Sequence, residues 1–144
     1  MILFYDEDVV SNLSQKRLLK SWIKSVVSSY GFLVGDISYI FCSDSYILDV
    51  NRKYLNHDYY TDIITFDYSS EQKISGDLFI SVDTVKSNSE LFKTNFIDEF
   101  HRVIIHGILH LCGLKDKCTE DEKKMREAED HALSILESYL QFKK

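Results

Sequence analysis

Residues 95–116, which read NFIDEFHRVIIHGILHLCGLKD, set the main expectations for the chain. Apolar side chains recur through this stretch at helical spacing, and Asn95 is a residue type that often begins a helix, so a helix is predicted over about residues 96–112. Gly113 follows directly, and a glycine in a left-handed turn is a common way for a helix to end. The stretch therefore predicts an apolar helix followed by a sharp turn of the chain.

Two histidines in this helix are candidate metal ligands. His106 and His110 lie four residues apart, so their imidazoles share one face of the helix and can point at one ion. The turn at Gly113 would bring Asp116 back as a third ligand. Imidazole and carboxylate ligands suit zinc or another divalent metal, and three protein ligands leave a fourth position for water. Alternatively, the two histidines are ordinary core or surface residues, and spacing alone leaves both interpretations open.

Outward from this helix, the pattern predicts more helices late in the chain and strands earlier. Helical periodicity predicts further helices at about residues 14–30, 44–51, 83–93 and 120–141. Alternating or β-branched and aromatic residues predict strands at residues 2–5, 37–41, 61–68 and 76–81. This order indicates an α+β (mixed α/β) class, with a small mixed sheet of about four strands packed against helices. The metal-binding helix would lie in the C-terminal half.

Length and composition indicate one compact domain over residues 1–144. The chain has no proline and five glycines, so no linker is evident, and its 44% hydrophobic and 13% aromatic content argues against disorder. No stretch approaches the roughly 18 apolar residues of a membrane span, and the start lacks the basic region of a secretory signal. Three widely spaced cysteines form no disulfide pattern. We therefore expect a cytoplasmic protein without membrane partners.

The charge balance limits how the chain could bind nucleic acid. A net charge of −6 argues against a basic surface overall, because phosphate contacts need local positive charge. The basic residues would have to act in local groups, either Arg52 with Lys53 or a second set. That second set consists of Arg102, Lys115, Lys117, Lys123, Lys124 and Arg126. Either group could equally be a solvated face that forms salt bridges.

Three blocks of the sequence resemble one known family. Residues 106–116 resemble the signature H-G-x-L-H-L-x-G-x-x-H of the YbeY family, the endoribonucleases of ribosomal RNA maturation. Residues 51–66, NRKYLNHDYYTDIITF, resemble its L-N-x-x-Y-R-x-x-D-x-x-T-D-V-L-S-F block, and residues 76–81, GDLFIS, its G-D-I-x-I-S strand. The resemblance implies a mixed α/β domain with one zinc ion. It also implies a single-strand-specific endoribonuclease that matures the 3′ end of small-subunit ribosomal RNA and acts in ribosome quality control, with the small subunit and assembly factors as partners.

The chain departs from the family pattern at two positions. Asp116 stands where the family usually has a third histidine, so the implied metal site is His106, His110 and Asp116, with altered affinity and room for a different metal. Leu55 stands where the family often has an arginine associated with activity. Arg52 lies one turn earlier if the segment is helical, and could compensate. Within the same block, Tyr59 and Tyr60 are candidate stacking platforms for single-stranded bases.

Two other functions fit parts of the pattern. Zinc peptidases share the histidine spacing, but a glutamate that serves as general base follows the first histidine in their motif, whereas this chain has Gly107. A base could instead come from Asp62 or Asp77, although both could equally be turn or cap residues. The other alternative is a non-enzymatic ribosome-assembly factor with a structural metal. The sequence identifies no catalytic base for any of these functions.

Overall fold

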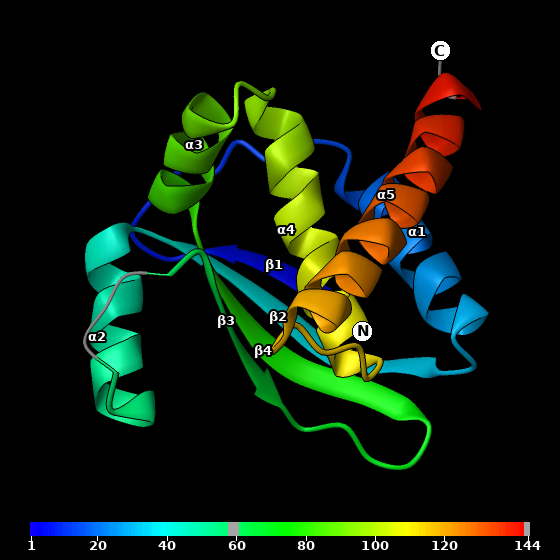
Figure 1. Ribbon diagram of the computed structural model, residues 1–144, viewed down its shortest axis with the longest axis horizontal. Coiled ribbons are helices and arrows are strands. Elements are labelled where there is room, and N and C mark those ends of the chain that lie inside the picture. The colour runs from blue at the N-terminus through cyan, green and yellow to red at the C-terminus, as the bar shows by residue number, and fades with distance from the viewer. Residues whose placement is uncertain (58–60, 143–144) are drawn as a thin grey trace.

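The computed structural model describes residues 1–57 and 61–142, with side chains described to residue 140. The elements in order are β1 Ile2–Asp6, α1 Lys16–Ser29, β2 Leu33–Cys42, α2 Asp44–Leu55, β3 Ile63–Asp67, β4 Lys73–Ser81, α3 Val82–Leu91, α4 Phe96–Leu111 and α5 Thr119–Phe142 (Figure 1). The strands form one sheet in the order β1-β2-β4-β3. β1 and β4 run parallel to β2, and β3 runs antiparallel to β4. The predicted single α+β domain with a mixed four-stranded sheet is confirmed within the described residues.

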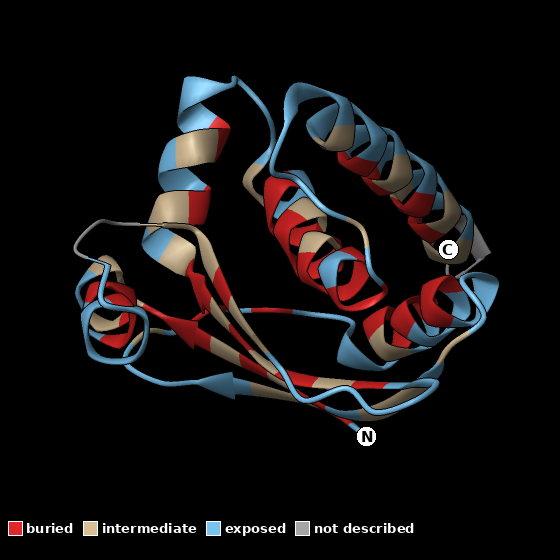
Figure 2. Ribbon diagram, turned by 60° about the horizontal axis from the view of Figure 1, so that its bottom comes forward, coloured by how far each residue is buried: buried red, intermediate tan, exposed pale blue. Residues whose placement is uncertain are grey.

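The two faces of the sheet carry different helices. Side chains of α1, α3, α4 and α5 join the larger core with Tyr39, Phe41 and Leu78 of the sheet. The opposite face, near the β3 edge, is covered by α2, whose Ile47 and Val50 pack with Ile64 of β3. In Figure 2, α2 accordingly lies apart from the other helices. Because side chains alternate along a strand, Ile63 contacts the larger core while its neighbour Ile64 contacts the α2 cluster.

Helix α4 is the central helix of the larger core. Its residues Phe100, Ile104 and Ile108 are fully buried, and the hydroxyl of the buried Tyr39 donates a 2.8 Å hydrogen bond to the Ile104 carbonyl. At Gly107 the helix approaches the sheet so closely that a Cβ atom would overlap Leu78 and lie 2.9 Å from Ile63 Cδ1. This glycine therefore lets α4 rest directly on β3 and β4.

Helix α5 is held against α1 and α4. The indole of Trp22 on α1 is buried and donates a 2.8 Å hydrogen bond to the carbonyl of Ala132 on α5. Along α5, Met125, Glu129, Ala132 and Leu136 are buried, which places a carboxylate in an otherwise apolar stripe. In the part of the chain that the structure describes, no helix is long and apolar enough to cross a membrane.

Candidate active site at the end of helix α4

The C-terminal end of α4 and the turn after it bring the predicted ligands toward one another. The backbone N–H of Gly113 donates to the His110 carbonyl, and that of Leu114 to the Leu109 carbonyl. Gly113 has a φ of 104°, which a residue without a Cβ adopts without strain. The chain consequently turns back, and Asp116 Oδ2 comes to 3.4 Å from Nε2 of His106.

A cavity of about 230 Å³ opens beside this turn. Its walls come from the start of β3, from α4 and from the loop after α4. It is lined by Thr61, Asp62, Ile63, Thr65, His106, His110 and Asp116. All three predicted metal ligands thus face one cavity, together with Asp62, one of the two acids considered as a base. Asp77 is not among the lining residues.

The structure does not assemble these ligands into a complete metal site. Over residues 1–57 and 61–140, no group of three or more histidine, cysteine, aspartate or glutamate side chains is placed to hold a metal ion. His106 and Asp116 are adjacent, whereas His110 is an exposed residue in the last turn of α4. The donor types suit zinc, and they share a cavity. The set His106, His110 and Asp116 therefore stays a prediction.

The second ring nitrogen of His106 has a partner that sequence reasoning missed. Nδ1 of His106 lies 2.7 Å from Oε2 of Glu129, whose side chain is only 8% exposed. A carboxylate accepts the hydrogen bond, so Nδ1 carries the proton and Nε2 is directed toward Asp116. Metal-binding histidines very commonly donate their other N–H to a carboxylate in this way. The only hint in the sequence is a glutamate within an apolar stripe of the last helix.

Charges around His106 shift the protonation of the site. Burial lowers the pKa of His106, but the hydrogen bond to Glu129 and the charges of Glu129, Asp62 and Asp116 outweigh it and raise the pKa above its ordinary value. Burial raises the pKa of Glu129, but His106 and Arg102 together bring it below the ordinary value. Burial raises the pKa of Asp62, with His106 opposing the rise. The cavity therefore holds a proton-binding carboxyl beside an imidazole.

The predicted substrate-binding residues lie elsewhere or outside the described residues. Arg52 is on α2, which packs on the other face of the sheet, and it does not line the cavity. Its guanidinium lies 3.9 Å from the Asp49 carboxylate. The neighbouring Tyr54 is 62% exposed on the same helix. Tyr59 and Tyr60 fall outside the described residues, so their prediction is untested.

The fold and this cavity define a small mixed α/β protein with a polar site at the end of its central helix. A family model described as "Endoribonuclease YbeY" matches residues 2–137. The chain belongs to the YbeY family, which confirms the resemblance inferred from the three sequence blocks.

Relatives in several bacteria resemble the chain over nearly its whole length. A protein of Parabacteroides distasonis named Endoribonuclease YbeY is 58% identical, over 94% of this chain and 95% of its own length. A protein of Bacteroides thetaiotaomicron with the same name is 59% identical, over 84% of this chain and 88% of its own length. The solution structure of a Thermotoga maritima protein matches with a TM-score of 0.64 at 26% identity, over 96% of this chain and 93% of that one.

Proposed function

We propose that the chain is a single-strand-specific endoribonuclease that acts in maturation of the 3′ end of small-subunit ribosomal RNA and in ribosome quality control. The observation that carries this proposal is the match of nearly the whole chain to a family whose similar members are named endoribonucleases. The small ribosomal subunit and its assembly factors would be its partners, and the cytoplasm its place of action.

We further propose that His106, His110 and Asp116 hold one zinc ion. The three side chains face one cavity, and the hydrogen bond from Nδ1 of His106 to Glu129 leaves Nε2 available as a donor atom. Asp116 in place of a third imidazole lowers the net charge of such a site, so another divalent metal is also accommodated. Zinc bound there would act as a Lewis acid, activating water or polarising a phosphodiester oxygen.

The chain's own residues supply proton transfer. Asp62 lines the same cavity, and its pKa is raised by burial, so its carboxylate is a better proton acceptor near neutral pH than an exposed aspartate. We assign Asp62 as the group that accepts the proton of the attacking hydroxyl, whether that hydroxyl belongs to water or to ribose. This fills the place that the sequence left without a base.

A strand of RNA would approach the cavity across the β3 edge. Thr61 and Thr65 line the cavity at β3, and the exposed residues Arg52, Lys53 and Tyr54 lie on α2, which packs behind the same strand. Positive charge and an exposed aromatic ring are what a single-stranded nucleic acid contacts. Arg52 remains our proposed substrate contact on this side of the molecule, and Tyr59 and Tyr60 stay proposed contacts on the basis of the sequence alone.

The two alternative functions are less well supported. The peptidase motif places its general base directly after the first histidine, but any side chain at position 107 would collide with Leu78 of the sheet, so this chain cannot carry that motif. A non-enzymatic assembly factor is not favoured by relatives that are named endoribonucleases.

Metal analysis and RNA cleavage test the proposal together. Purified protein should contain about one zinc per chain by elemental mass spectrometry, and His110→Ala and Asp116→Ala should each lose it while keeping the fold, since both residues are exposed. Wild type should cut a single-stranded RNA oligonucleotide and spare its duplex, and His110→Ala should cut neither. Metal that survives Asp116→Ala would show that the third ligand is misassigned, and wild-type protein without metal would show that the site is degenerate.

A further inference from the structure

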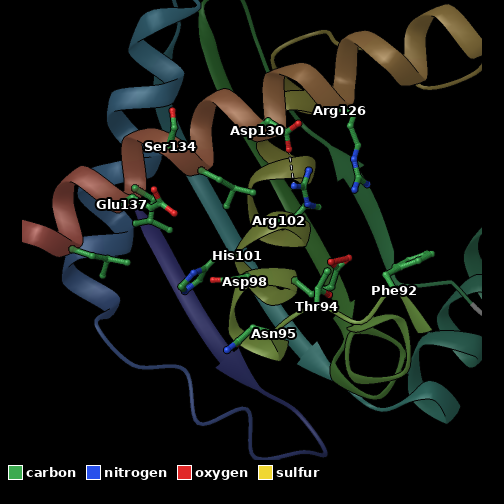
Figure 3. A pocket seen from close by; sticks show the side chains of 14 residues that line it. Phe92, Thr94, Asn95, Asp98, His101, Arg102, Arg126, Asp130, Ser134 and Glu137 are labelled. Atoms are coloured by element: carbon green, nitrogen blue, oxygen red, sulfur yellow. Dashed lines mark hydrogen bonds and ion pairs between the residues drawn. The ribbon is translucent and has the colours of Figure 1, made fainter. Parts of the chain in front are cut away.

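A guanidinium joins α4 to two successive carboxylates of α5. Nη1 of Arg102 lies 2.8 Å from Oε1 of Glu129, and Nη2 lies 2.7 Å from Oδ1 of Asp130. Figure 3 shows Arg102 reaching from α4 toward Asp130 across the groove between the two helices, whose volume is about 440 Å³. The Arg102 side chain is 19% exposed and that of Glu129 8%, so the contact with Glu129 is largely shielded from solvent, whereas Asp130 is 59% exposed.

Both oxygens of the Glu129 carboxylate accept hydrogen bonds. Oε1 accepts from Arg102 and Oε2 from His106, at 2.8 and 2.7 Å. Rotation of the carboxylate about its last bond would break both contacts in a side chain that is 8% exposed. A buried carboxylate that loses a partner pays a substantial desolvation cost, so the orientation with both partners is strongly favoured.

We propose that Arg102 is a positioning residue for His106. By fixing the Glu129 carboxylate, it holds the His106 ring in one orientation, with the proton on Nδ1 and with Nε2 directed at Asp116. The proposal rests on the proposed function in so far as His106 is a metal ligand. It adds a residue on α4, one helical turn before His106, that acts on the ring only through Glu129 of α5.

Removing Arg102 separates positioning from simple electrostatics, because the two effects have opposite signs. Loss of a positive charge near a cation site should by itself tighten binding of Zn²⁺. Loss of the hydrogen bond from Arg102 to Glu129 should weaken zinc binding, because the orientation and tautomer of the His106 ring are no longer fixed. Residues that hydrogen-bond to metal ligands typically contribute roughly 10- to 100-fold in metal affinity. The direction of the change therefore decides between them.

The chain offers matched variants for this test. Arg102→Met keeps the length of the side chain and removes the guanidinium, and Arg102→Lys keeps the charge but cannot bridge two carboxylates. Arg126→Met is the control. Arg126 lines the same groove, and it also lines a second cavity of about 310 Å³ beside His106, Asp116 and Glu129, but in the described residues it makes no hydrogen bond or ion pair with Glu129. Glu129→Gln should place an amide N–H against Nδ1 and move the ring proton to Nε2.

Two measurements are made on each full-length variant. The first is the His106 tautomer in zinc-free protein, from long-range ¹H–¹⁵N spectra at a pH where the ring is neutral. The second is zinc affinity by competition with a chelator. We expect the Nδ1–H tautomer in wild type and in Arg126→Met. Arg102→Met should show a mixture of the Nδ1–H and Nε2–H tautomers, and Glu129→Gln should show the Nε2–H tautomer. Zinc affinity should fall roughly 10- to 100-fold in Arg102→Met, less in Arg102→Lys, and not at all in Arg126→Met.

The proposal is overturned if Arg102→Met and Arg102→Lys both keep the wild-type tautomer and bind zinc as tightly as wild type or more tightly. Should Arg102→Met not fold, Arg102→Lys alone decides the matter. Failure of the metal proposal gives a different result, namely wild type that binds no zinc. The tautomer measurement needs no metal, so a tautomer that changes in Arg102→Met still supports the positioning of His106 in that case.

Discussion

The imidazole of His106 meets a carboxylate on each side. Glu129 lies at Nδ1 and Asp116 near Nε2, while Asp62 raises the His106 pKa from within the same cavity. An imidazole in this setting attracts either a proton or a metal cation to the Nε2 side. Protons and zinc should consequently compete for His106, and the zinc-free protein should be sensitive to pH where the zinc-bound protein is not.

The raised pKa of His106 predicts how stability of the zinc-free protein changes with pH. A pKa that is higher in the folded than in the unfolded chain favours folding of the protonated form. This stabilisation is complete below the unfolded pKa of about 6.5 and is lost as pH rises through the folded pKa. Urea unfolding of zinc-free protein should therefore give a free energy of unfolding that declines from pH 6 toward pH 9.

Glu129→Gln provides the comparison for that pH series. The substitution removes the charge that contributes most to raising the pKa of His106, so the decline should become shallower. Glu129 has a lowered pKa and titrates in the acid range, so its own ionisation does not change above pH 6. An equally steep decline in Glu129→Gln would assign the pH dependence to other groups.

The three cysteines should differ sharply in reactivity. Burial raises the pKa of Cys42 to about 12 and that of Cys112 to about 11, with nearby acids adding to the effect at Cys42. Cys118 is exposed. The thiolate is the reactive form, so at pH 8 a thiol reagent should modify Cys118 rapidly and the other two only after denaturation. Peptide mapping of the labelled protein checks this, and rapid labelling of Cys112 would contradict the packing around it.

At the scale of single elements, Gly107 governs how closely α4 approaches the sheet. A Cβ at this position overlaps Leu78 and crowds Ile63, so Gly107→Ala should be destabilising even though alanine favours helix formation. Overpacking of this kind costs about 1–3 kcal/mol. Urea unfolding should show this loss, while Ser138→Ala at an exposed position of α5 should change stability little. Gly107→Ala as stable as wild type would mean that the sheet yields readily to α4.

Features encoded by neighbouring residues were predictable from the sequence. The helix at 96–111 and the turn at Gly113 follow from local periodicity and from one glycine, and both are observed. Strand β4 begins at Lys73, earlier than the predicted residue 76, because Lys73 and Ile74 already pair with Leu33 and Val34 of β2. Helix α2 extends to Leu55, past the predicted end at residue 51.

Features that depend on contacts between distant segments were not predictable in this way. Glu129 reaches His106 from another helix, and nothing in the spacing of either residue indicates the pair. The position of α2 on the opposite face of the sheet follows from how Ile47 and Val50 meet Ile64, which local pattern does not reveal. Arg102 was assigned to a group of basic residues by charge alone, although its guanidinium is committed to two carboxylates of α5.

At the scale of the whole molecule, the sheet separates the cavity from the exposed basic residues of α2. For a chain of net charge −6, RNA affinity must come from such local groups. Arg52→Glu with Lys53→Glu should therefore weaken binding of a single-stranded RNA oligonucleotide several-fold, and the loss should shrink at higher salt. Fluorescence anisotropy at two salt concentrations measures this.

The matched control reverses two charges at a different place. Lys16→Glu with Lys24→Glu alters exposed lysines of α1, on the other face of the sheet from α2, by the same total charge. Equal weakening by both pairs would show that net charge, and not a contact at α2, determines RNA affinity. A loss confined to the α2 pair would support the approach of RNA across the β3 edge.

Glu129 lies on the last helix of the chain, so it is synthesised after the candidate ligands that it helps to orient. Translation produces His106, His110 and Asp116 before it produces Glu129, so a growing chain contains the candidate ligands while it still lacks the carboxylate that orients one of them. The indole of Trp22, made much earlier, can secure α5 only after Ala132 has been added. The ring of His106 is therefore oriented only once α5 has been made and has packed against α1 and α4.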